Sequence, residues 1–226
     1  MIKQVAFIVG FLTAPAFGVI IDDFSVGPMT LVADIDHRMP YELQTGLDPD
    51  AVIGGNRLAF LLLDSPSPSD RAVATVDTTT HTFRLDVDGR LEGYSIRWGA
   101  INGTQADLAL NADLLSDGSD AFHVDVVANA VSQTLKLSVA SGAHEGQYSG
   151  DGVFRRLPAS NTPFSIRVPF SDLSKIDFHD VDYIGLSWTT VFRGQDLTLG
   201  AIRTVPEPST LVMLILGLLG VWMRRR

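Results

Sequence analysis

The 226-residue sequence contains no cysteine. This absence excludes disulfide bonds, thiolate metal sites, iron–sulfur clusters and cysteine nucleophiles together. Charged residues are also few, at 19% of the chain, whereas apolar residues make up 46%. The composition therefore supplies enough hydrophobic material for a core and too little charge for a disordered chain.

Basic residues are the scarcer charged class. The sequence has 17 Lys and Arg against 26 Asp and Glu, which gives a formal net charge of -9. Proteins that bind nucleic acids normally present a basic face. We therefore expect no nucleic-acid partner.

Motifs for catalysis and metal binding are missing as well. No H-E-x-x-H, G-x-S-x-G, P-loop or G-x-G-x-x-G pattern occurs. We assign no catalytic residue, metal ligand or cofactor and expect no enzyme, although a polysaccharide-processing enzyme stays an alternative because a pair of glycosidase carboxylates leaves no motif. His123 alternates with Val124 and Val126 and is expected to face solvent. The histidines, none in a short metal-ligand pair, are His37, His81, His123, His144 and His179.

The first residues have the pattern of a secretory signal peptide. Lys3 gives a short basic start, residues 5–12 are apolar but too short to span a bilayer, and Ala14-Pro15-Ala16 gives the small-x-small pattern that signal peptidase requires. We predict a signal peptide over residues 1–16, cleaved after Ala16 or, as second choice, after Gly18. The alternative is a buried first strand.

The last residues form an apolar run of 13, Leu211 to Met223, closed by Arg224, Arg225 and Arg226. A spanning helix needs about 17–25 residues, so a buried core helix is one interpretation. However, the run is apolar on all sides, and terminal arginines can snorkel to the membrane surface. We predict a short transmembrane helix over 209–223. The arginines form a cytoplasmic basic anchor under the positive-inside rule, which places the chain between the two ends outside the cytoplasm.

A recognisable motif directly precedes this run. Val205-Pro206-Glu207-Pro208-Ser209-Thr210-Leu211, followed by the apolar segment and the arginines, resembles the PEP-CTERM sorting signal of Gram-negative bacteria. The resemblance covers residues 205–226 and implies processing by exosortase, a membrane-embedded cysteine protease often encoded beside exopolysaccharide genes. It also implies that Pro206, Glu207 and Pro208 are the recognition element. The two prolines prevent helix formation and leave an extended segment that a protease can reach. A proline-rich linker before an uncut tail anchor is the alternative.

Between these ends, residues 17–204 show the pattern of one β domain. Runs such as Thr82–Asp88, Thr134–Ala140 and Phe164–Phe170 alternate apolar and polar residues, which is typical of strands with one wet face. Turn residues separate the runs, among them Gly150-Asp151-Gly152, and no amphipathic helix of three turns occurs. We therefore predict an all-β fold, an antiparallel β-sandwich or jelly roll. The further predicted strands are Leu58–Leu63, Ala72–Val76, Tyr94–Trp98, Phe122–Val127, Tyr183–Trp188 and Leu197–Ile202.

The opening segment 20–25 and the closing segments 178–184 and 196–199 are similar to galactose-binding-like jelly rolls. That resemblance implies that the first and last strands pair, in a fold that many carbohydrate-binding modules use.

Two kinds of ligand site are candidates within the domain. Hard carboxylate ligands suit Ca²⁺, so a structural calcium ion is one hypothesis, with solvated turn carboxylates as the alternative. Aromatic rings can stack on sugars, although core packing is the favoured interpretation for Trp98 and Trp188. The calcium candidates are Asp22, Asp23, Asp177, Asp180 and Asp182. The sugar candidates are Trp98, Trp188, Tyr94, Tyr148 and Tyr183.

The sequence thus predicts an exported, non-enzymatic protein of the envelope or of a biofilm matrix. It is first held in the inner membrane with the domain outside the cytoplasm and is then released to the cell surface or beyond. Its expected partners are signal peptidase, exosortase, the membrane and exopolysaccharide. A carbohydrate-binding module that recognises matrix glycans and a permanently anchored membrane protein are the alternatives.

Overall fold

The computed structural model describes residues 18–63, 67–89, 91–99, 110–142, 149–191 and 193–206, and only the backbone of residues 91, 92 and 189–191. The predicted signal peptide with Ala14 and Ala16, the predicted helix over 209–223, Glu207, Pro208 and the three arginines all lie outside these residues. Within them, no helix has the length and apolar character needed to cross a membrane.

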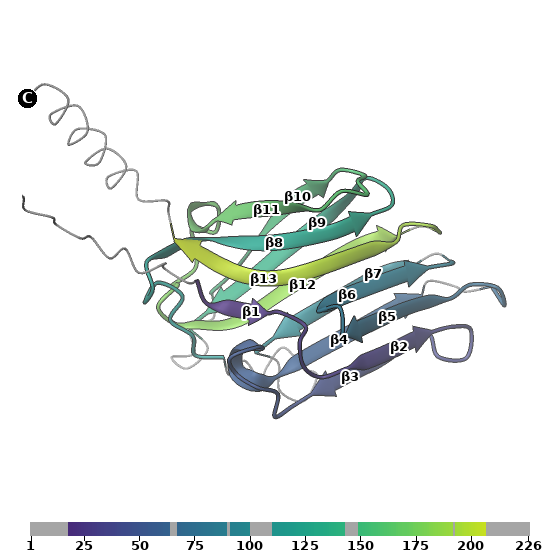
Figure 1. The fold of residues 1–226 in the computed structure, drawn as a ribbon, viewed down its shortest axis with the longest axis horizontal. Helices are drawn as coiled ribbons and strands as arrows, with labels where there is room; N and C mark the ends of the chain where they lie inside the picture. Colours follow the sequence, from purple (N-terminus) through teal and green to yellow (C-terminus); the bar gives the residue numbers. More distant parts are fainter. Residues whose placement is uncertain are drawn as a thin grey trace, which may run out of the picture.

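The described residues form two antiparallel sheets that face each other as a sandwich (Figure 1). The prediction of an all-β antiparallel sandwich is therefore confirmed. The seven-stranded sheet has the order β11-β8-β13-β6-β5-β2, with β1 paired to β13, and the six-stranded sheet has the order β10-β9-β12-β7-β4-β3. The strands of the first sheet are β11 (Phe164–Pro169), β8 (Ser119–Asn129), β13 (Leu197–Pro206), β6 (Thr82–Val87), β5 (Ala72–Asp77), β2 (Met29–Ala33) and β1 (Ile20–Asp22). Those of the second are β10 (Ser149–Leu157), β9 (Gln133–Ser141), β12 (Val181–Val191), β7 (Leu91–Trp98), β4 (Arg57–Leu63) and β3 (Tyr41–Gln44).

Every strand predicted from alternation is present, but four more occur: β1, β2, β3 and β10. The prediction of a turn at Gly150-Asp151-Gly152 is wrong, because these residues lie inside β10 and pair with Ala140, Val139 and Ser138 of β9. An edge strand such as β10 has one free side and buries little, so its sequence needs no apolar alternation.

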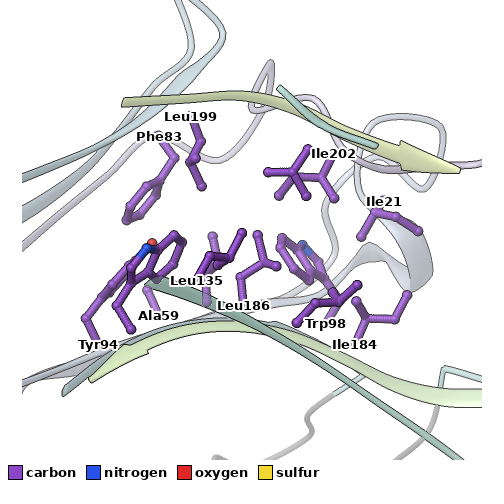
Figure 2. Packing of buried hydrophobic residues seen from close by; sticks show 14 of the residues in the cluster. Ile21, Ala59, Phe83, Tyr94, Trp98, Leu135, Ile184, Leu186, Leu199 and Ile202 are labelled. Atoms are coloured by element: carbon purple, nitrogen blue, oxygen red, sulfur yellow. The ribbon is translucent and has the colours of Figure 1, made fainter. Parts of the chain in front are cut away.

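Side chains from the inner faces of both sheets fill the space between them (Figure 2). Phe83 from one sheet stacks on Tyr94 from the other at 5.4 Å between ring centroids, and Tyr94 stacks on Trp188 at 4.7 Å. Leu199 and Leu186 are completely buried beside this stack. Such stacking adds about 0.5–1.5 kcal/mol per pair to the burial of the rings, so the stack is a main contact between the layers.

An ion pair is buried at one end of the same core. Asp22 of β1 and Arg57 of β4 are both fully buried, and the guanidinium donates to both carboxylate oxygens, at 2.6 and 2.7 Å. Trp98 Nε1 and the Phe24 backbone N–H also donate to this carboxylate, each at 2.9 Å. Burial raises the pKa of the Asp22 carboxyl, while the hydrogen bonds and charge of Arg57 act in the opposite direction.

The ion pair also corrects one sequence hypothesis. The Asp22 carboxylate accepts from four protein donors, so it anchors the first strand instead of serving as a calcium ligand. Arg57 uses its remaining donors on the backbone oxygen of Gly27 at 3.1 Å and on Gln44 Oε1 at 3.0 Å. A charge this deeply buried is tolerated only because nearly every donor and acceptor around it is matched.

The two ends of the described chain meet at β1 and β13. Ile20 pairs with Arg203, in keeping with the expected pairing of first and last strands. Thr204 N donates to the Val19 carbonyl at 2.9 Å, and Val19 N donates to Thr204 Oγ1 at 2.8 Å. The strand continues to Pro206, opposite Ser119, so the first residue of the Pro-Glu-Pro motif lies at the end of a sheet strand.

Candidate ligand-binding face

The aromatic residues considered as sugar contacts divide between the core and the surface. Trp98, Trp188 and Tyr94 are at most 2% exposed and belong to the core, as expected for the two tryptophans. Tyr183 points out of the six-stranded sheet, where it packs with Ala140 outside the main core. Tyr148 lies outside the described residues.

The outer face of the six-stranded sheet carries the exposed aromatic side chains that the sequence analysis missed. Tyr41 on the edge strand β3 is 68% exposed, and Phe154 on the opposite edge strand β10 is 60% exposed. Strand pairing connects them through one residue on each intervening strand. We call this set the aromatic row: Phe154, Lys136, Ser187, Ser95, Phe60 and Tyr41.

The row crosses the strands at right angles to their direction. Its five strand spacings of about 4.8 Å place its ends roughly 24 Å apart. Between the two exposed rings lie the partly exposed Ser187 and Phe60, the buried Ser95, and Lys136. The Lys136 ammonium group is 5.6 Å from the centroid of the Phe154 ring. The row therefore combines ring faces at its ends with hydrogen-bonding groups in its middle.

The face is hollowed at the β10 end of the row. An open depression of about 390 Å³ is lined by residues of β9, β10 and β12, among them Lys136, Ser138, Gly152 and Tyr183. Gly152 keeps the depression open, because a Cβ there would lie 2.8 Å from Lys136 Cε.

The outer face of the seven-stranded sheet holds ion pairs and His123. Asp125 pairs with Arg203, and Asp120 pairs with Arg167. His123 lies between these pairs and is partly buried, so the expectation of a solvent-facing side chain holds only in part. Partial burial, followed by the charge of Arg203, lowers the pKa of His123.

The aspartates proposed as calcium ligands do not form one site. Among the residues that the structure describes, no three His, Asp or Glu side chains are grouped closely enough to hold a metal ion. Asp23 accepts from Ser25 N at 2.9 Å and Asp177 accepts from His179 N at 2.9 Å, while Asp182 is fully buried. The solvated-turn interpretation fits Asp23 and Asp177, which cap local turns.

Comparison with known proteins gives one family match. Residues 204–226 match the family model of the PEP-CTERM protein-sorting motif, which confirms the resemblance seen in the sequence. No curated protein matches the chain.

Solved structures similar to this chain include carbohydrate-binding modules of Clostridium thermocellum. A family 11 module in complex with a β-1,3-1,4-mixed-linked tetrasaccharide is 11% identical at a TM-score of 0.42, with 86% of this chain and 98% of that chain covered. The family 11 module of cellulase Lic26A-Cel5E is 10% identical at a TM-score of 0.40, covering 83% and 93%. The CBM22-1–GH10 modules of xylanase 10B with xylohexaose are 16% identical at a TM-score of 0.34, covering 84% and 29%. Sequence identities and TM-scores this low do not identify a ligand for this chain.

Proposed function

We propose that this chain is an exported glycan-binding protein, sorted to the cell envelope by its C-terminal signal. The aromatic row on the outer face of the six-stranded sheet carries the proposal. Sugar rings bind proteins through aromatic faces that pack on their C–H surfaces and through polar groups that meet their hydroxyls. The row offers both kinds of contact along one line, and the depression beside Lys136 gives a ligand a place to settle.

The route outward follows from the two ends of the chain. The signal peptide over 1–16 starts export and is removed by signal peptidase. The helix over 209–223 then holds the chain in the inner membrane, with Arg224, Arg225 and Arg226 on the cytoplasmic side. Exosortase recognises Pro206, Glu207 and Pro208 and releases the β domain to the cell surface or the surrounding matrix. Matrix exopolysaccharide is the ligand we propose there.

The β domain acts by binding and not by catalysis in this proposal. The contacts that carry it are rings, hydroxyls and an ammonium group, none of which needs to exchange a proton with the ligand. Incubation of the mature protein with a panel of polysaccharides tests this point. Release of new reducing ends would contradict it.

Affinity electrophoresis of the mature protein through gels that contain purified matrix glycans tests the binding itself. We expect retardation that is reduced at least fivefold in Tyr41→Ala or Phe154→Ala, because stacking contacts of this kind contribute about 1 kcal/mol each. Ile35→Ala is the matched control, since Ile35 is also exposed, at 44%, but lies outside the row. Equal retardation of all variants would refute the role of the row.

A further inference from the structure

We infer that the ligand of the outer face of the six-stranded sheet is an acidic polysaccharide, one that carries carboxylate or sulfate groups. The inference rests on the proposed glycan-binding function and adds the chemical class of the glycan. It comes from the placement of charge on this face.

Acidic residues outnumber basic ones by 26 to 17 in the chain, yet the strands of this face carry the opposite sign. In β9 and β7, every second residue belongs to the core, so the residues between them face outward. In β10, Val153 packs against the core, so its neighbours in the strand face outward. Asp151 lines the depression from an inward-facing position on the edge strand β10, opposite Val139, but among the outward-facing residues that the structure describes on these six strands none is Asp or Glu. Three are basic: Lys136 on β9, Arg97 on β7 and Arg156 on β10.

The described groups that these bases contact are neutral. Arg97 Nε donates to Ser95 Oγ at 3.0 Å, and Arg156 Nε donates to Ser132 Oγ at 2.9 Å. Lys136 lies over the Phe154 ring. A hydroxyl or a ring orients a cation without cancelling its charge, so each base keeps charge to offer a ligand.

The opposite face of the sandwich gives the contrast. There the strand arginines pair with aspartates: Arg84 with Asp86 at 2.7 Å, Arg167 with Asp120 and Arg203 with Asp125. That face neutralises itself and offers little to an anion. Positive charge is thus concentrated on the face that also bears the aromatic row, and an anionic chain is its electrostatic complement.

Matched pairs of polymers test the inference with the mature full-length protein. Polygalacturonate, alginate and hyaluronate are each compared with their fully esterified forms, which keep the sugar backbone and lose the charge. We expect at least one acidic form to bind tenfold or more tightly than its ester, with an affinity that falls as salt is raised. Equal binding of the acidic and neutral forms would overturn the inference and leave the proposed glycan binding intact. Binding of no polymer of either kind would overturn both.

Point variants locate the effect. Lys136→Gln and Arg156→Gln should each weaken binding to the acidic form about two- to fivefold, the range expected for exposed charge pairs. Arg156 lies outside the aromatic row, so Arg156→Gln should leave binding to a neutral glycan unchanged. Arg84→Gln on the other face is the control and should change neither. Both test positions lie on β9 and β10 at the edge of the sheet, so thermal melting should show intact folding. Loss of affinity in Arg84→Gln, or none in the two test variants, would refute the assignment.

Discussion

Replacement of Arg57 by methionine tests the buried ion pair most directly. The change removes the six hydrogen bonds that Arg57 donates to described residues. Among the described donors, it leaves the fully buried Asp22 carboxylate with Trp98 Nε1 and the Phe24 N–H. Breaking a buried pair on one side costs about 3–5 kcal/mol, because the remaining charge stays in a medium of low polarity. For a domain of this size, we expect the melting temperature to fall by roughly 10 °C.

The dependence on pH separates this explanation from a packing defect. Without Arg57, burial is opposed only by the hydrogen bonds from Phe24 and Trp98, so the pKa of the Asp22 carboxyl rises further. The folded variant then holds a proton that the unfolded chain releases above the ordinary pKa of 3.8, so its stability falls as pH rises through that value. We therefore expect a smaller deficit at pH 4 than at pH 7.

Urea unfolding followed by circular dichroism and by the fluorescence of the tryptophans measures both effects. The double variant Asp22→Leu with Arg57→Met, which removes both charges, should recover most of the lost stability. A single-variant loss below about 1 kcal/mol, or a double variant no more stable than the single one, would refute the reasoning.

Two further outcomes follow from the sorting motif and from His123. Replacing Glu207 by Ala, or Pro206 and Pro208 together by Ala, should make unprocessed protein accumulate in the membrane fraction, as read from the mass of the native C-terminus; unchanged release would argue against recognition at this motif. The lowered pKa of His123 means that the folded protein binds a proton less readily than the unfolded chain. The free energy of unfolding is therefore unaffected by His123 above about pH 6.5, the ordinary pKa of histidine, and decreases as the pH falls from there toward the folded pKa. Melting at pH 5 and pH 7 should therefore show a smaller acid loss in His123→Gln than in the unaltered protein, and the same loss in both would contradict the assignment.

The strands that could be predicted from sequence are those in which apolar and polar residues alternate because one face of the strand is buried. Phe83, Leu85 and Val87 lie on one face because that face is buried between the two sheets. β10 was missed because Gly150, Gly152 and the polar residues around them resemble a turn, and their pairing partner β9 lies before them in a different segment.

The candidate site could not be predicted in the same way. The aromatic row takes one residue from each of six strands, so it exists only once the register of the whole sheet is set. Phe154 within a glycine- and arginine-rich segment was the available signal, since an aromatic ring there has no core periodicity to explain it. Asp22 could not be assigned to its role because its partner Arg57 is 35 positions away.

The junction of β1 with β13 has a mechanical consequence. Before the tail is cut, the domain is held by its C-terminal end, and a polymer bound to the six-stranded sheet would load it along β13. This strand is hydrogen-bonded to β8 and β6 and lies inside its sheet (Figure 1). Such a load must shear many bonds at once, whereas tension between the two neighbouring ends, Gly18 and Pro206, peels β1 away bond by bond. The fold is thus strong in the direction in which a tethered matrix would pull and weak in the direction in which its own termini would separate.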